Sequence, residues 1–187
     1  MKILSARAQA LENIFFNEQD QELTELISKQ KDERDQIFAL RSLSGISNKS
    51  VLDNAVKLGM NATTFSALCL IPLLKVAWSD HNCDQKESHV ILEFAAENGI
   101  EVDSAPYKLL QSWLSKEINS NLFIIWKEYV HSLEETLTQV ELNEIKNEII
   151  GRAIAVARAS GGILGIGSIS DVEKKVLNEL EVFFEQK

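Results

Sequence analysis

The sequence is poor in cysteine and proline, and it has no long hydrophobic run. Two cysteines, Cys69 and Cys83, are too few and too differently placed for a disulfide framework, so we expect both to be reduced thiols. The most apolar window, residues 67–74, contains Pro72 and falls far short of the roughly 18 residues that a membrane span requires. The N-terminal residues also lack the apolar block of a signal peptide. These absences favour a cytoplasmic protein without a transmembrane segment.

Basic residues are also scarce. The 187 residues include 19 lysines and arginines against 28 aspartates and glutamates, which gives a formal net charge of -9. No basic stripe with interleaved aromatic side chains offsets this charge, and a phosphate backbone would be repelled. We therefore expect no nucleic-acid partner. A hydrophobic content of 45% is enough for a full core, and we expect a single all-helical domain over residues 1–187.

Apolar residues recur at helical spacing along the chain, and no segment shows the strict alternation of a half-buried strand. The pattern predicts an all-α fold, a compact bundle of about eight to nine helices. Gly45, Gly59 and Gly99 stand where helices should end, and Pro72 should kink the fourth helix. The predicted helices cover residues 5–29, 33–44, 50–58, 62–79, 85–98, 104–116, 119–136, 138–160 and 171–185.

A helical hairpin in the middle of the chain recurs near the C-terminus. A shift of 80 residues carries the apolar positions 73, 76 and 77 onto 153, 156 and 157. After the connecting loop, a shift of 86 residues carries Asp84 and Glu87 onto Ser170 and Glu173. Equivalent apolar spacing means that the second helix of each hairpin should bury the same face. The sequence thus favours an internal duplication with pseudo-twofold packing.

The segment between the two helices of the first hairpin is acidic and contains Asp80, Asn82, Asp84 and Glu87 within eight residues. Oxygen ligands of this kind suit a hard divalent cation, provided that the loop folds back over the next helix. The spacing is not that of an EF-hand, because Gln85 occupies the position that requires glycine. Asp80, Asn82, Asp84 and Glu87 are therefore candidate oxygen ligands for such a cation.

Other interpretations of the same segment stay open. Asp84 and Glu87 have the spacing of a capping box, which would satisfy free amides at a helix start without any metal. His81, Cys83 and His89 offer nitrogen and sulfur ligands to zinc, although their spacing matches no usual structural zinc site. A catalytic pair of carboxylates around a metal-bound water is a further alternative.

The stretch from Pro72 to Ile100, PLLKVAWSDHNCDQKESHVILEFAAENGI, resembles the TerB-like family, named for a tellurite-resistance protein. The resemblance rests on an apolar helix that runs into an acidic turn and then a glutamate-led helix, and it extends more weakly to the second hairpin. It covers residues 60–186 and leaves residues 1–45 as an N-terminal helical extension. His81 stands where the family pattern has a glycine, and serines replace both aspartates of the second hairpin, which argues against a symmetric pair of metal sites.

The resemblance implies a compact helical bundle and a divalent cation, calcium, magnesium or zinc, at Asp80, Asp84 and Glu87. It also implies a non-catalytic cytoplasmic role in stress response or protein interaction. The alternative is a metal-dependent, hydrolase-like enzyme that uses the same turn. The amphipathic N-terminal helix lies outside the repeat, so it is a candidate surface for a protein partner or for a homodimer. The family name does not establish tellurite resistance for this chain.

Overall fold

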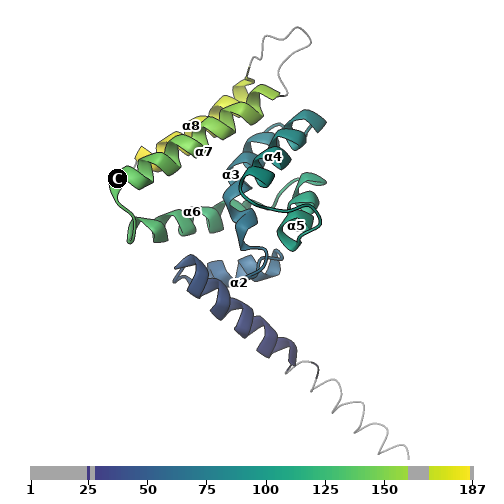
Figure 1. The fold of residues 1–187 in the computed structure, drawn as a ribbon, viewed down its shortest axis with the longest axis vertical. Coiled ribbons are helices and arrows are strands. Elements are labelled where there is room, and N and C mark those ends of the chain that lie inside the picture. Colours follow the sequence, from purple (N-terminus) through teal and green to yellow (C-terminus); the bar gives the residue numbers. More distant parts are fainter. Residues whose placement is uncertain (1–24, 26–27, 160–168, 186–187) are drawn as a thin grey trace, which may run out of the picture.

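The computed structural model describes residue 25 and residues 28–159 and 169–185, and all regular structure in that part of the chain is helical (Figure 1). The all-α fold is confirmed, as is the expected number of helices. A helix over residues 28–44 comes first. It is followed by α2 (Lys49–Lys57), the 3-10 helix η1 (Phe65–Leu70), α3 (Ile71–Ala77), α4 (Gln85–Glu97), α5 (Ala105–Leu114), α6 (Ser120–Glu134), α7 (Gln139–Ala159) and α8 (Asp171–Glu185).

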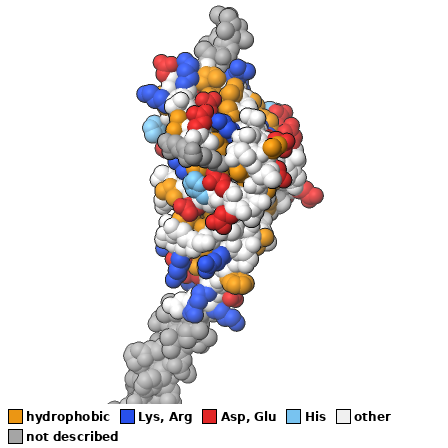
Figure 2. All heavy atoms as spheres, turned by 90° about the vertical axis from the view of Figure 1, so that its left-hand side faces the viewer, with side chains coloured by type: hydrophobic (Ala, Val, Ile, Leu, Met, Phe, Trp, Pro, Cys, Tyr) orange, Lys and Arg blue, Asp and Glu red, His pale blue; other side chains and the backbone are white. Residues whose placement is uncertain are grey.

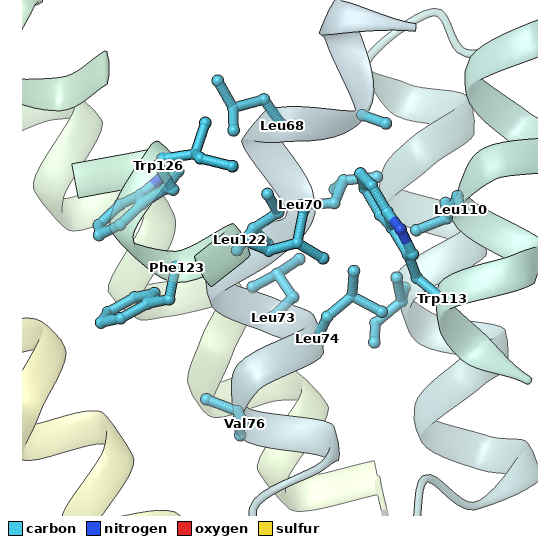
Figure 3. Packing of buried hydrophobic residues seen from close by; sticks show 14 of the residues in the cluster. Leu68, Leu70, Leu73, Leu74, Val76, Leu110, Trp113, Leu122, Phe123 and Trp126 are labelled. Carbon is cyan, nitrogen blue, oxygen red and sulfur yellow. The ribbon is translucent and has the colours of Figure 1, made fainter. Parts of the chain in front are cut away.

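The short helix α3 forms the centre of the bundle. It contacts α4, α6, α7 and α8, and η1 precedes it directly. Of its seven residues only Lys75 is not buried. Figure 3 shows side chains of α3 between Trp126 of α6 on one side and Trp113 of α5 on the other. The acidic turn leaves the C-terminal end of α3, so the core holds the start of this turn in place.

The prediction of one kinked helix over residues 62–79 is wrong. The structure has a tight 3-10 helix, η1, and then a separate α-helix with Pro72 in its first turn. A proline has no N–H to donate, and the first turn is the place in a helix where that donor is not needed. Upstream, the Asn61 side chain accepts hydrogen bonds from the amides of Thr63 and Thr64, which forms a turn instead of a helix start. Pro72 thus marks a new helix rather than a bend.

The predicted break between residues 29 and 33 is also wrong, because residues 28–44 form one uninterrupted helix. The stretch from Gln30 to Asp32 between the two predicted helices is polar. These residues are exposed, so the helix needs no apolar face at this point, and neither glycine nor proline interrupts it. Most of the predicted first helix, including residues 5–24, lies outside the described residues.

The last turn of helix 28–44 belongs to the core. Leu40, Ser44 and the following Ile46 are almost completely buried, and the Ser132 hydroxyl of α6 donates to the Ser44 carbonyl. Gly45 ends the helix as expected, with a φ of 71° that a residue with a side chain rarely adopts. A Cβ atom at Gly45 would lie 3.2 Å from Cβ of Ser132, which adds a steric reason for glycine.

Exposed large hydrophobic side chains are scattered over the described surface. The most exposed, Phe38, Val102 and Val140, belong to three different segments of the chain. On the face shown in Figure 2, hydrophobic side chains are interspersed with acidic and basic ones. Isolated exposed apolar residues are normal for a folded protein and do not by themselves mark an interface. Within the described residues, none of the helices combines the length and the apolar composition that crossing a bilayer requires.

Candidate cation site at the turn before α4

The acidic turn is anchored to α5 and to the segment that follows it. The indole N–H of Trp78 donates to the Trp113 carbonyl at 3.0 Å, and Nδ1 of His81 lies 2.8 Å from a carboxylate oxygen of Glu117. His81 has a φ of 67°, in the left-handed region that glycine adopts most readily. This conformation gives a physical reason for glycine at this position in the TerB-like pattern. Histidine is among the residues that tolerate it.

Asp84 and Glu87 form the capping box that their spacing indicated. Oδ1 of Asp84 accepts hydrogen bonds from the amides of Lys86 and Glu87, both at 2.8 Å. In return, Oε2 of Glu87 accepts the amide of Asp84 at 2.9 Å. These bonds satisfy amides at the start of α4 that have no partner within the helix. One oxygen of each carboxylate is thereby engaged by the backbone.

Glu87 is an unusual member of a capping box because it is buried. Only 3% of its surface is exposed, and the pKa of its carboxyl group is raised to about 7. Loss of hydration is the main cause, and repulsion from Asp84, Glu173 and Asp80 adds to it, while the hydrogen bond from the Asp84 amide acts in the opposite direction. Among the described residues, no positive charge contributes to the pKa shift of Glu87.

The second hairpin repeats this local structure. Oε2 of Glu173 accepts the amide of Ser170 at 2.6 Å, and the Ser170 hydroxyl accepts the amide of Glu173 at 3.2 Å. Glu173 is buried as well, with 5% of its surface exposed. A capping box is thus present in both hairpins, and each places a glutamate in the interior. The proposed duplication of the hairpins rests on this match and on the shared burial of positions 73, 76, 77 and 153, 156, 157.

Glu173 is the member of the acidic site that sequence reasoning missed. Its charge contributes to the raised pKa of Glu87, so the structure brings the two equivalent glutamates close enough to repel each other. The sequence analysis matched Glu173 to Glu87 as a corresponding position in a second hairpin. It did not place the two side chains beside each other. The sequence contained a signal for this proximity. If the two hairpins pack with pseudo-twofold symmetry, as their repeat predicts, equivalent helix starts lie near the same axis.

Asp80 is less closely joined to the other candidate ligands. It is exposed, and its Oδ1 accepts the amide of Asn82 at 3.0 Å within the turn. Its link to Glu87 is electrostatic, through the repulsion that raises the Glu87 pKa. In the part of the chain that the structure describes, no three histidine, cysteine, aspartate or glutamate side chains already lie close enough together to ligate one metal ion. A cation would have to draw Asp80 toward Asp84 and Glu87.

The chemistry of the available atoms fits a hard cation. The hydroxyl oxygen of Ser79, at the start of the turn, is buried and has no hydrogen-bond partner among the described residues. The carboxylates of Asp80, Asp84 and Glu87 likewise offer oxygen, the ligand atom that calcium and magnesium prefer. An unpartnered buried hydroxyl is costly unless a ligand or water satisfies it. The turn therefore has both the charge and the ligand type for calcium or magnesium.

The alternative zinc ligands do not converge. His81 pairs with Glu117, whereas His89 lies 3.3 Å from Glu93, four residues along α4. Sγ of Cys83 lies 3.2 Å from the Ser88 hydroxyl. The pKa of the Cys83 thiol is raised, mainly by burial, and the neighbouring carboxylates add to the shift. Zinc at this turn would require these partners to separate.

Two pockets open elsewhere on the described structure. The first has a volume of about 180 Å³ and is bounded by η1, α3, α6 and α7. The second, of about 490 Å³, lies between the end of α2, α5 and the start of α6. Neither pocket is lined by Asp80, Asp84 or Glu87. A substrate held in either pocket would not contact the proposed metal ligands.

Replacing Ser170 with alanine should lower the free energy of unfolding by about 1 kcal/mol, because the Glu173 amide loses its cap acceptor. Urea unfolding measures the change. The matched control is Ser120→Ala, since Ser120 is the first residue of α6 and its helix is capped by Asn119 instead. If Ser170→Ala lowered the free energy of unfolding no more than Ser120→Ala, the second capping box would not stabilise α8.

Comparison with protein-family models, with curated proteins and with solved structures finds no match. The resemblance to the TerB-like family thus stays a prediction that rests on the residues around the acidic turn.

Proposed function

We propose that the chain is a non-catalytic, cytoplasmic TerB-like protein that binds a divalent cation, calcium or magnesium, at the turn from Ser79 to Glu87. In this proposal the cation orders the turn, and the ordered turn is a docking point for a protein partner in a stress response. The observation that carries the proposal is the buried carboxylate of Glu87, which is repelled by three further carboxylates. A divalent cation would compensate this charge.

The second observation in support is the position of the turn. Asp80 is exposed at the end of α3, while Glu87 is buried at the start of α4. A cation bound between them would be reachable from solvent and would connect the surface of the turn to the core. The buried Glu173 of α8 lies near enough to contribute to the same field. Binding should therefore also strengthen the packing of the second hairpin on the first.

The alternative function is a metal-dependent hydrolase that uses Asp80 with Asp84 or Glu87 around a metal-bound water. Such an enzyme needs a concave substrate site beside the metal. Neither of the two pockets described above includes the candidate ligands, so neither supplies such a site. A third possibility, in which these acids serve only as helix caps, predicts no effect of any cation.

Thermal unfolding of the metal-stripped protein, with and without millimolar calcium, magnesium, manganese or zinc, tests the proposal. A ligand at 100 times its dissociation constant adds about 2.7 kcal/mol, which corresponds to a rise in midpoint of roughly 5–10 °C for a chain of this size. We expect calcium or magnesium to produce such a rise. The Asp80→Asn variant should lose it, because a charged ligand is removed while an oxygen that accepts the Asn82 amide is retained.

The matched control is Asp35→Asn, which removes the same charge from an exposed position on helix 28–44. This variant should keep the full cation effect. Two results would contradict the proposal: no rise in midpoint with any of the four ions, or an equal rise in the parent chain and in Asp80→Asn. The first would leave Asp84 and Glu87 as helix caps, and the second would place the cation elsewhere.

A further inference from the structure

The pocket that is bounded by η1, α3, α6 and α7 has apolar and aromatic walls. Its volume is about 180 Å³, and Leu70, Leu73, Trp126, Val130 and Ile149 contribute to its lining. Figure 3 shows Leu70, Leu73 and Trp126 together at the junction of α3 and α6. An apolar cavity of about 150 Å³ is large enough to bind benzene. The pocket is therefore large enough for one substituted aromatic ring.

The charged residues at the pocket neutralise each other. Glu148 and Arg152, one turn apart on α7, form an ion pair at 2.7 Å. Arg152 is held further by Glu97 at 3.6 Å and by the ring of Phe94, whose centroid lies 5.1 Å from the guanidinium carbon. A charged ligand would have to disrupt this pair in order to gain a counter-ion, whereas a neutral ligand would leave it intact. The pocket thus favours a ligand without net charge.

Two polar groups at the wall are available to a neutral ligand. Tyr129 and Cys69 both line the pocket, and they are close enough for the ionised thiolate and phenolate to repel each other. Desolvation raises the pKa of both groups, so both are neutral at physiological pH. The phenol hydroxyl and the thiol each both donate and accept hydrogen bonds. A ligand with one hydroxyl or N–H group would find a partner beside the apolar walls.

We propose that this pocket binds a small neutral aromatic molecule with one hydrogen-bonding substituent, of the size of phenol or indole. The ring would pack among Leu73, Trp126 and Ile149, and the polar substituent would face Tyr129 or Cys69. The inference is independent of the cation site, because Asp80, Asp84 and Glu87 do not line the pocket.

Protection of Cys69 from alkylation tests the inference. Cys69 is exposed at the pocket, and the chain has one other cysteine, Cys83, so Cys83→Ser leaves a single thiol. The rate of iodoacetamide alkylation is measured at pH 8.5 with increasing phenol or indole, and with benzoate and benzylamine as charged probes of similar size. We expect phenol or indole to slow alkylation at least threefold with saturation, and the charged probes to have little effect.

A blocked pocket provides the control. Ile145 lies half-buried at the same pocket, and Ile145→Trp should fill the space and abolish protection. Because a larger side chain can disturb folding, ligand-observed NMR on the parent chain provides a second test that needs no substitution, and it should show transfer to indole but not to benzoate. Asp80→Asn should retain protection, which separates this site from the cation site. No protection by either neutral probe, equal protection by benzoate, or protection that persists in a folded Ile145→Trp variant would overturn the inference.

Discussion

The Glu87→Gln variant should be more stable than the parent chain at pH 8 in metal-free buffer, by about 1–3 kcal/mol, and of similar stability at pH 5. Glutamine is the neutral counterpart of the protonated acid, and its carbonyl oxygen still accepts the Asp84 amide, so the capping box is retained. The gain at pH 8 arises because the parent chain must bury an ionised carboxylate near three others. Urea unfolding at several pH values measures the difference.

The sign of the pH dependence follows from proton binding. The pKa of Glu87 is about 7 in the folded chain and 4.5 in the absence of these surroundings, so the folded state holds the proton more tightly. The contribution of this group to stability is complete below pH 4.5 and is lost as the pH rises to 7 and beyond. A shift of this size corresponds to an effect on the order of 2–3 kcal/mol. Stability should therefore fall between pH 5 and pH 8.

Glu93→Gln is the matched control for this variant. Glu93 belongs to the same helix, but 59% of its side chain is exposed, and its partner is His89. Its replacement should change the free energy of unfolding by less than about 0.5 kcal/mol at either pH. If Glu87→Gln gave no more stability at pH 8 than at pH 5, the carboxylate of Glu87 would not be destabilised by its surroundings, and the main support for a compensating cation would be removed.

Replacing Trp126 with alanine should have the largest effect on stability, a loss of about 3–5 kcal/mol. Trp126 is 1% exposed and connects α6 to the C-terminal end of α8. Its ring stacks on Phe123 at a centroid distance of 5.2 Å and also contacts Phe183 at 5.2 Å and Phe184 at 6.0 Å. Alanine would leave a cavity in the middle of this cluster, which the helices on either side cannot close without moving.

The control for Trp126 is Phe38→Ala, because Phe38 is also aromatic but 72% exposed on helix 28–44. Its loss should cost less than about 0.5 kcal/mol. Denaturant unfolding followed by circular dichroism measures both variants. A loss below 1 kcal/mol for Trp126→Ala would show that the packing of α6 against α8 contributes little, and the arrangement of the second hairpin described here would be wrong.

The local features of the fold were predictable because they depend on short-range chemistry. Asn48, Asp84 and Ser104 cap helices as their side chains suggest, and Gly45 and Gly59 end helices with positive φ. Phe123 and Trp126 stand at helical spacing in α6, and both are buried in the core. The errors concern places where periodicity is ambiguous. Pro72 fits a kink or a helix start equally well on sequence alone, and the polar stretch near residue 31 resembles a break.

The acidic site was only partly predictable. Sequence spacing identified Asp84 and Glu87 as a capping box, and the hydrogen bonds confirm it. The burial of Glu87 and the proximity of Glu173 depend on how the two hairpins pack, which no short-range pattern encodes. The unpartnered hydroxyl of Ser79 is likewise a result of packing. The burial of Glu87 among other carboxylates, more than the spacing of the acids, supports the proposed cation site.

Calorimetric titration of the metal-stripped chain with calcium and magnesium is the decisive test of cation binding at the acidic turn. We expect one bound ion per chain with a dissociation constant on the order of micromolar, and loss of the binding heat in Asp80→Asn but not in Asp35→Asn. No binding heat with either ion, or the same heat in the parent chain and in Asp80→Asn, would contradict it.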